Sequence, residues 1–151
     1  MYEFLEYRVE HVMTRDPVAI SPGTTLREAQ ELFERHDFDA LPVLDEAEGV
    51  VGMLSKLDLC KAFAFTTSRM VPAYDEIIRQ PAREVMTRDF APAAPGLPLT
   101  RALQLMIEAG TKSLPVVEGG RLVGIVARED VLSAIRRAAQ GRRPEPPAPR
   151  A

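Results

Sequence analysis

The sequence contains no tryptophan, a single cysteine and only two histidines among its 151 residues. Cys60 cannot form an internal disulfide, and with only His11 and His36 it cannot complete a tetrahedral zinc site. A Ser/His/Asp order, a phosphate-loop glycine series and metal-ligand spacings are also missing from the sequence. These absences predict a protein that is not an enzyme and that needs neither a metal nor a disulfide.

Long apolar runs and a strong excess of charge are lacking as well. No stretch approaches the ~20 apolar residues that span a bilayer. Glu3 and Glu6 stand where a signal peptide needs a basic start. The 19 Lys and Arg residues against 22 Asp and Glu residues give a net charge of −3, which offers no general attraction to nucleic acid. We therefore expect a cytoplasmic globular protein that binds neither a membrane nor nucleic acid.

A five-residue sequence occurs twice in the chain. Residues 12–16, Val-Met-Thr-Arg-Asp, recur letter for letter as residues 85–89. The same shift of 73 residues superimposes the two Leu-Pro-Val triplets of the sequence. Beyond a turn in which one residue is lost, a shift of 72 places Asp58 on Asp130. Length changes are typical of exposed turns, so the chain consists of two copies of one unit.

Each copy is predicted to fold as β-α-β-β-α. In the first copy, residues 17–20 form a short extended segment, and a Thr-x-x-Glu capping box at 25–28 begins an amphipathic helix. Residues 41–44 and 50–54 are short apolar strands joined as a hairpin. Ser55 then caps a second helix, and the second copy contains the same series.

The segments outside the repeat are less informative. The chain is predicted to divide into an N-terminal extension, a first unit, a linker, a second unit and a tail, at residues 1–10, 11–65, 66–82, 83–138 and 139–151. Phe4, Leu5 and Tyr7 of the extension are expected to pack against the rest of the protein. The tail holds four prolines, several arginines and almost nothing apolar to bury, so we expect it to be disordered.

The turn between the last strand and the last helix of each copy can carry chemistry. Within residues 52–58 a strand ends, Ser55 caps the next helix, and Asp58 follows one turn in. Backbone N–H groups at a helix start attract anions such as phosphate, and a carboxylate there can accept two hydrogen bonds from a ribose diol. The same two residues can equally form a capping pair that serves the helix alone. By themselves the residues leave both interpretations open.

The two copies resemble a pair of CBS domains, the tandem often called a Bateman module. The matching features are Val-Met-Thr-x-Asp before the first strand, Leu-Pro-Val on the second, and Gly-x-x-Ser-x-x-Asp or Gly-x-x-x-x-x-Asp at the last strand-to-helix turn. The resemblance covers residues 9–137. It implies an α/β (α+β) fold in which two β-α-β-β-α CBS units pack as a pseudo-twofold pair, commonly within a homodimer. It also implies clefts between the units that bind AMP, ADP, ATP or S-adenosylmethionine.

The resemblance implies two ligand-binding clefts, each combining residues from both copies. In site one, Asp58 would bind the ribose. Near the phosphate would lie Ser55, Lys56, Lys112 and Ser113, and around the adenine Thr87, Phe90 and Pro92. Site two, expected to be weaker, would have the corresponding set: Asp130, Arg128, Thr14, Val18, Ala19, Ile20, Asp39 and Ala40. The chain is thus expected to hold two related sites.

The two predicted sites differ in charge. Site one has a hydroxyl and two cations, whereas site two has Ala127 where the hydroxyl is expected. Site two also has acids at Asp39 and Glu129, with Arg128 to offset them. A carboxylate repels a nearby phosphate, and more strongly in a partly buried cleft. We therefore expect a phosphorylated adenosine to bind more tightly in site one, and site two to be empty, weaker or filled by a less negative ligand.

Two functions are compatible with these features. In the first, a stand-alone regulatory module senses an adenosine compound and signals in trans to a separate, unidentified protein partner. In the second, the same module serves only structure and dimerisation, and its clefts stay empty. The aspartates at both predicted sites favour the first function, whereas the departures of site two from the expected pattern favour the second.

The other candidate residues are expected to be structural. His11 and His36 align with Glu84 and Ala109 in the other copy, so neither histidine belongs to the repeated pattern. This favours surface or capping roles for both. Cys60 is expected to be a small buried residue.

Overall fold

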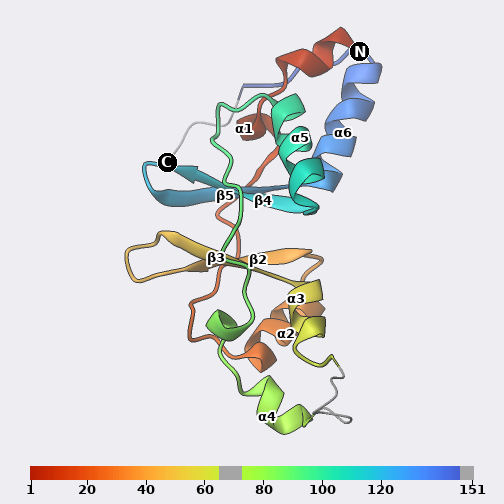
Figure 1. Ribbon diagram of the computed structural model, residues 1–151. Helices are drawn as coiled ribbons and strands as arrows, with labels where there is room; N and C mark the ends of the chain where they lie inside the picture. The colour runs from red at the N-terminus through yellow and green to blue at the C-terminus, as the bar shows by residue number, and fades with distance from the viewer. Residues whose placement is uncertain (65–72, 147–151) are drawn as a thin grey trace. The chain divides into compact units, whose positions relative to one another are not determined.

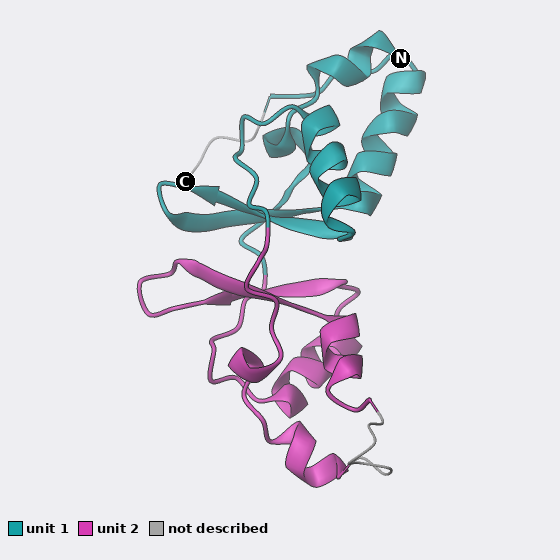
Figure 2. Cartoon of the chain, in the orientation of Figure 1, with its two compact units in different colours: residues 1–17, 91–151 teal, residues 18–90 magenta. Residues whose placement is uncertain are grey.

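The chain folds as two compact units that do not coincide with the two copies of the repeat. A computed structural model describes residues 1–64 and 73–146. Unit 1 comprises Met1–Pro17 and Ala91–Ala151, and unit 2 comprises Val18–Phe90 (Figure 2). The segment that precedes each copy therefore belongs to the unit built around the other copy.

Unit 2 is built around an antiparallel hairpin with its helices nearby (Figure 1). Its elements in chain order are α2 (Leu26–Arg35), β2 (Ala40–Leu44), β3 (Val50–Ser55), α3 (Lys56–Lys61), α4 (Tyr74–Ile78) and the 3-10 helix η2 (Ala82–Glu84). Isolated bridges extend the hairpin on both sides, from Ile20 to Val43 and from Thr87 to Met53. The order of elements from Ile20 to α3 is the β-α-β-β-α series predicted for the first copy.

The helix α2 begins where its capping box predicts. Thr25 Oγ1 accepts the Glu28 N–H at 3.2 Å, and the Glu28 carboxylate accepts the Thr25 N–H at 3.0 Å. Leu26, Ala29 and Phe33 lie at helical spacing and are buried. Burial of one large apolar side chain contributes about 1.5–3 kcal/mol. Packing of this apolar face, more than helix propensity, therefore holds α2 in place.

Unit 1 repeats this order on a three-stranded antiparallel sheet. Its elements are the 3-10 helix η1 (Tyr2–Glu6), α1 (Val9–Val12), β1 (Thr14–Arg15), α5 (Leu99–Ala109), β4 (Ser113–Glu118), β5 (Arg121–Ala127) and α6 (Arg128–Ala139). The strand order is β1-β5-β4, and Ala93 adds a parallel bridge to Val116. The first strand of the chain thus joins the sheet of the second copy.

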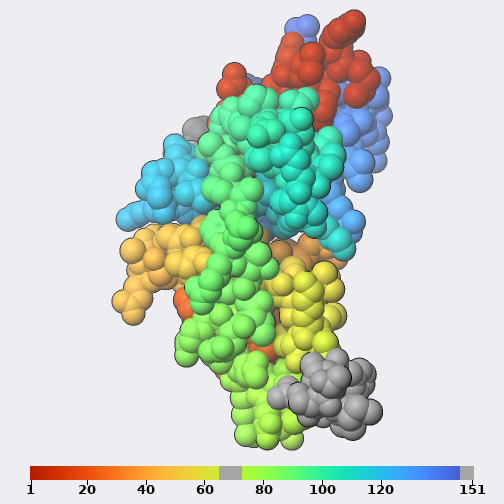
Figure 3. Space-filling view, in the orientation of Figure 1, coloured from red at the N-terminus to blue at the C-terminus, as the bar shows by residue number. Residues whose placement is uncertain are grey.

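The N-terminal extension contributes to the core of unit 1. Phe4 and Tyr7 are only 8% and 1% exposed and pack in one apolar cluster with residues of α5 and α6. Leu5 is 67% exposed, so the prediction that it packs is wrong. A 3-10 helix turns about 120° per residue, so Leu5 cannot share the inward side of η1 with Phe4. On α5, which lies on the surface shown in Figure 3, Ile107 also remains exposed.

Each unit contains a backbone segment, which we call a strap, from the beginning of the other copy. We define the straps as residues 7–15 in unit 1 and residues 80–88 in unit 2. Each strap makes three backbone hydrogen bonds at equivalent positions. In unit 1 these join Leu99 N–H to Tyr7 O (2.9 Å), Val9 N–H to Leu97 O (2.9 Å) and Glu10 N–H to Pro95 O (2.9 Å). In unit 2 they join Leu26 N–H to Gln80 O (2.9 Å), Ala82 N–H to Thr24 O (2.7 Å) and Arg83 N–H to Pro22 O (3.0 Å). The duplication in the sequence is therefore also a duplication of these contacts.

A glycine in the last strand of each hairpin lets the strap come close. A Cβ atom at Gly52 would lie 2.7 Å from the strap's methionine sulfur and 3.1 Å from its threonine carbonyl oxygen. At Gly124 both distances would be 2.8 Å. The Val-Met-Thr motif and the glycine are thus two sides of one close packing contact.

The structure describes parts of the predicted linker and tail. The helix α4 lies within the predicted linker, and α6 extends to Ala139, the first residue of the predicted tail. Arg142 and Arg143 contact Tyr7 and Glu6 of the N-terminal extension. The extension thus supplies a hydroxyl and a carboxylate as partners for the first part of the tail, and the disorder of the tail stays a prediction. Outside the described residues lie residue 65 of the first predicted unit, residues 66–72 of the linker and residues 147–151 of the tail.

Candidate functional site

Asp58 stands on the first turn of α3 and is only 8% exposed. Its Oδ2 accepts the Ser55 N–H at 3.0 Å, and Ser55 Oγ accepts the Asp58 N–H at 3.0 Å. This reciprocal capping box fixes the position of the carboxylate, because both residues are locked to the backbone where β3 ends. The capping role considered for this pair is therefore present.

Thr87 of the strap reaches the same carboxylate. Its hydroxyl donates towards Asp58 Oδ1 and Oδ2, each at 3.2 Å. Two backbone hydrogen bonds between Thr87 and Met53, of 2.8 and 2.9 Å, hold the strap in this register. An ionised carboxylate offers about four acceptor positions. Asp58 can therefore accept further donors, such as the two hydroxyls of a ribose, while it keeps these contacts.

The equivalent turn in unit 1 is less complete. Asp130 Oδ2 accepts the Ala127 N–H at 2.8 Å, but alanine has no hydroxyl to return the bond. Thr14 pairs with Ile125 of β5, the position equivalent to the Thr87–Met53 pair. No hydrogen bond joins Thr14 to Asp130 among the described residues. The carboxylate of Asp130 is thus held by one donor, whereas that of Asp58 is held by two residues.

The environment of Asp130 disfavours its charged form. Burial raises the pKa of the Asp130 carboxyl above its ordinary value, and the neighbouring Glu129 raises it further. The Ala127 N–H and the positive charge of Arg137 act in the opposite direction on this pKa. Desolvation is the largest of these effects.

We predict that Asp130→Asn makes the protein more stable at neutral pH. Asparagine keeps an oxygen for the Ala127 N–H but removes the desolvated charge. Because the folded-state pKa of Asp130 is raised, its stabilising contribution is complete below the ordinary value of 3.8 and is lost as the pH rises through the folded-state value. The difference in urea midpoint between variant and wild type should therefore shrink as the pH falls from 7 to below 3.8. Asp37→Asn, at an exposed position, is the control, and a pH-independent difference at Asp130 would contradict the prediction.

The residues predicted to face a phosphate lie at the helix starts of their own units. The Asp39 carbonyl accepts the Lys56 N–H at 3.1 Å in unit 2, and the Lys112 carbonyl accepts the Arg128 N–H at 3.0 Å in unit 1. Asp39 thus neighbours the Asp58 turn, and Lys112 neighbours the Asp130 turn. The predicted sites instead group Lys112 with Asp58 and Asp39 with Asp130, each pair drawn from both units. That grouping stays a prediction.

The other predicted site residues are also divided between the units. In unit 2 lie Ser55, Lys56, Thr87 and Phe90 of site one, and Val18, Ala19, Ile20, Asp39 and Ala40 of site two. In unit 1 lie Pro92, Lys112 and Ser113 of site one, and Thr14, Arg128 and Asp130 of site two. The structure therefore brings Asp58, Ser55 and Thr87 into contact in one unit, and places Asp130, Arg128 and Thr14 in the other.

Several of these residues already have contacts within their own unit. The Lys56 ammonium lies 6.0 Å from the centre of the Phe33 ring, and Arg128 Nε lies 3.2 Å from Glu129 Oε1. The backbone N–H of Ile20 donates to the Pro42 carbonyl of β2, and the Ile20 carbonyl accepts the Leu44 N–H of the same strand. Of the predicted adenine contacts in site two, Ile20 thus has its backbone N–H and C=O engaged within unit 2.

The histidines and the cysteine fall outside these turns. His11 Nδ1 accepts the Arg8 N–H at 2.8 Å, which confirms a capping role, and burial lowers its pKa. His36 stacks on Phe38 with ring centres 4.8 Å apart. Cys60 is exposed, so the prediction of a buried residue is wrong. It follows Asp58 and Leu59 on α3, whose inward positions those two residues occupy.

The described residues give no sign of a metal site or of a membrane span. Within residues 1–64 and 73–146, no three His, Cys, Asp or Glu side chains gather as they would around a metal ion. None of the helices in these two ranges combines the length and the apolar character that crossing a membrane requires.

Two contacts were not predicted from the sequence. The first is the packing of the strap methionines against Gly52 and Gly124. The repeated spacing of Val-Met-Thr and glycine was a usable signal for it. The second joins Tyr7 to Arg142, 135 residues away, and no local pattern indicates it.

The fold and the two helix-start aspartates define a tandem pair of small α/β domains. A family model described as the CBS domain matches residues 9–65 and 82–137. The chain belongs to the CBS domain family, as the motifs at its strand-to-helix turns indicate.

Relatives of similar length support this assignment. The CBS domain-containing protein YhcV of Bacillus subtilis is 34% identical over 124 residues, covering 82% of this chain and 81% of the relative. The crystal structure of a putative acetoin utilization protein (AcuB) from Vibrio cholerae has a TM-score of 0.76 at 28% identity and covers 90% of this chain and 95% of that one. Matches to enzymes are partial: the chain spans 15% of an A-adding tRNA nucleotidyltransferase of Aquifex aeolicus.

Two solved CBS structures contain adenosine compounds. The CBS domain pair of protein MJ0100, in complex with 5′-methylthioadenosine and S-adenosyl-L-methionine, has a TM-score of 0.72 at 26% identity, covering 89% of this chain and 97% of that one. CBSX2, in complex with AMP, has a TM-score of 0.74 at 26% identity, covering 88% of this chain and 98% of that one.

Proposed function

We propose that this protein is a regulatory module that binds an adenosine compound through Asp58 and, more weakly, through Asp130. The observation that carries the proposal is the buried Asp58 carboxylate, fixed by Ser55 and Thr87 with acceptor capacity to spare. The complexes of related proteins with AMP, S-adenosyl-L-methionine and 5′-methylthioadenosine support this ligand class.

In the proposed complex the ribose hydroxyls donate to Asp58. Charge-assisted hydrogen bonds of this kind are about twice as strong as neutral ones. The ligand's phosphate needs other partners, because the N–H groups of Ser55, Lys56 and Asp58 are already engaged. Cationic side chains, as predicted for Lys56 and Lys112, and the Ser113 hydroxyl would supply them. Thr87, Phe90 and Pro92 are proposed for the adenine.

The proposed Asp130 site has different requirements. Its carboxylate accepts the Ala127 N–H, without a second hydrogen-bond donor among the described residues, and Glu129 lies beside it in the sequence. A phosphate is less favourable there, so the site suits a ligand with less negative charge. The remaining proposed contacts are Arg128 and Thr14 from unit 1, and Val18, Ala19, Ile20, Asp39 and Ala40 from unit 2.

Regulation requires that the ligand bind one arrangement of the protein better than another. We propose that ligand binding biases such an equilibrium, and that a homodimer of the chain passes the change in trans to a protein partner. A module with empty clefts that serves only structure is the alternative.

A thermal-shift screen tests the proposal. The full chain is heated with AMP, ADP, ATP or S-adenosylmethionine, each in large excess over the protein. A ligand at a hundredfold its dissociation constant stabilises a protein by ~2.7 kcal/mol, which raises the Tm of a chain of this length by roughly 5–11 °C. Guanosine compounds at equal concentration serve as the control. A Tm unchanged by all four adenosine compounds would favour the structural alternative.

A further inference from the structure

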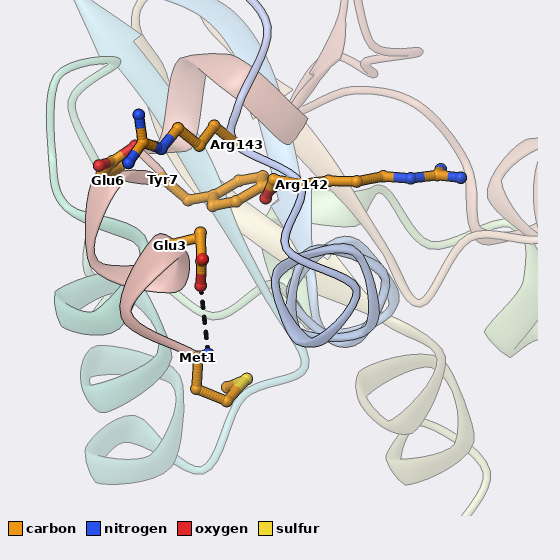
Figure 4. A network of polar contacts seen from close by, with 6 residues as sticks. All are labelled: Met1, Glu3, Glu6, Tyr7, Arg142 and Arg143. Atoms are coloured by element: carbon orange, nitrogen blue, oxygen red, sulfur yellow. Dashed lines mark hydrogen bonds and ion pairs between the residues drawn. The ribbon is translucent and has the colours of Figure 1, made fainter.

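The two ends of the described chain are joined on unit 1 by a group of contacts that we call the clasp (Figure 4). The clasp consists of Glu6, Tyr7, Arg142 and Arg143. The Tyr7 hydroxyl donates to the Arg142 carbonyl at 3.1 Å, and Arg143 Nε lies 3.4 Å from Glu6 Oε2. The Tyr7 ring is almost completely buried, and the Arg137 guanidinium lies 5.6 Å from its centre.

The buried part of the clasp carries most of its interaction energy. The ion pair joins side chains that are 74% and 49% exposed, and solvent screens such pairs strongly. By contrast, the Tyr7 hydroxyl bond is partly buried. Arg137 Nε is buried without a hydrogen-bond partner among the described residues, and its guanidinium lies within cation–π distance of the Tyr7 ring. Tyr7 is therefore the central residue of the clasp.

The clasp continues into the strap of unit 1. The Tyr7 carbonyl accepts the Leu99 N–H at 2.9 Å, the first of the backbone bonds that hold this strap. The strap then brings its methionine against Gly124 and its Thr14 beside Ile125 of β5. Tyr7 thus lies at one end of a continuous bonded segment, and Thr14 lies at the other.

A second route leads from Tyr7 to Asp130. Arg137 and Asp130 lie seven positions apart on α6, which places them on the same face of the helix. The charge of Arg137 favours the ionised form of the Asp130 carboxyl. The ring that positions Arg137 therefore also influences the acid of the proposed site.

The strap of unit 2 is anchored differently. The residue equivalent to Tyr7 is Gln80, and the preceding helix α4 buries Ile77 and Ile78 completely. These side chains pack with Leu26 and residues of α3. Apolar packing of nearby residues therefore anchors this strap, whereas the strap of unit 1, besides its own apolar packing, has an additional contact with a residue after α6.

We propose that Tyr7 is a positioning residue for the Asp130 site, because the clasp holds both the strap of unit 1 and Arg137. Ligand affinity at Asp130 therefore depends on the clasp, whereas ligand affinity at Asp58 does not. This inference rests on the proposed function. It adds that the segment after α6 controls one of the two sites selectively.

Tyr7→Phe tests the proposal, because it removes the hydroxyl and keeps the buried ring. The change is made in an Asp58→Ala background, which reports the Asp130 site, and in an Asp130→Ala background, which reports the Asp58 site. Each full-length variant is titrated calorimetrically with S-adenosylmethionine and with AMP. We expect affinity at the Asp130 site to fall about three- to tenfold, the usual effect of one lost hydrogen bond, and affinity at the Asp58 site to stay unchanged. Tyr2→Phe, at an exposed position, should change neither site.

Hydrogen exchange provides a readout that needs no ligand. In Tyr7→Phe, the strap amides of Val9, Glu10 and Met13 should exchange faster than in the wild type, and the Thr87 amide should not. Equal losses of affinity at both sites, no loss at either, or no binding in the Asp58→Ala background would overturn the proposal, as would unchanged exchange in the strap. If the wild type bound no adenosine compound, the proposed function would fail, while faster exchange would still show that the clasp holds the strap.

Discussion

Replacing Asp58 by alanine is expected to lower the affinity for AMP about 100-fold, whereas replacing Asp130 should leave most of it. The alanine removes both acceptors for the ribose diol, and hydrogen bonds to a charged group contribute about 1.5–3 kcal/mol each. The lower end of this range, summed over two bonds, is about 3 kcal/mol, which corresponds to slightly more than the stated factor. Asp130 has a less complete set of partners and an acidic neighbour. Its loss should therefore affect a phosphorylated ligand little.

The Asp58 variant also loses its capping box, so the effect on folding must be separated from the effect on binding. Glu28→Ala is the matched control, because it removes the corresponding capping carboxylate from α2. Both variants should lose stability because each loses the carboxylate of its capping box, but only Asp58→Ala should lose binding in isothermal titration. If Asp130→Ala abolished AMP binding while Asp58→Ala left it intact, the assignment of the two sites would be reversed.

Replacing Gly124 by alanine is expected to destabilise unit 1 by about 1–3 kcal/mol, the usual cost of overpacking. The new Cβ would lie 2.8 Å from the Thr14 carbonyl oxygen, and this backbone atom cannot move without disturbing the pairing of β1 with β5. A methionine side chain can adjust more easily. Gly52→Ala should therefore cost less, because the corresponding carbonyl contact there is 3.1 Å.

The controls for this prediction come from the repeat itself. Gly23 and Gly96 occupy equivalent turns, and a Cβ at either would meet its nearest neighbour at 3.9 or 3.8 Å. Urea denaturation of the four alanine variants should rank Gly124 as the most destabilised and Gly52 as intermediate. If Gly124→Ala lowered the stability no more than Gly96→Ala, the strap would be able to move away from Gly124 at little cost, and the prediction would be wrong.

The elements of the fold were predictable because their signals are local. The capping boxes at Thr25 and Ser55 mark helix starts, and short apolar runs mark the strands. The exchange of straps was not predictable in the same way. Residues 12–16 indicate an extended segment but do not say which sheet it joins, since partner choice in a sheet depends on tertiary packing.

The candidate site was predictable to a similar extent. The residues alone left Asp58 as either a cap or a ligand-binding acid, and the structure shows that it caps the helix while Thr87 contacts it. The family resemblance paired these two residues, although they are 29 positions apart. The clasp was missed because Tyr7 and Arg142 belong to segments without periodicity. The sequence of the tail gives no sign of its contacts, because its partners Tyr7 and Glu6 lie in the extension at the other end of the sequence.

The exchange of straps also sets an order of assembly. Unit 2 is one continuous stretch, so all of its residues are available once the chain has been synthesised to Phe90. Unit 1 needs its opening residues together with the second copy, and its contact between Tyr7 and Arg142 closes a loop of 135 residues. Such long-range closure is slow, since the entropy of the loop is lost before the contacts form. Residues 1–17 of unit 1 are thus expected to pack later than the residues of unit 2.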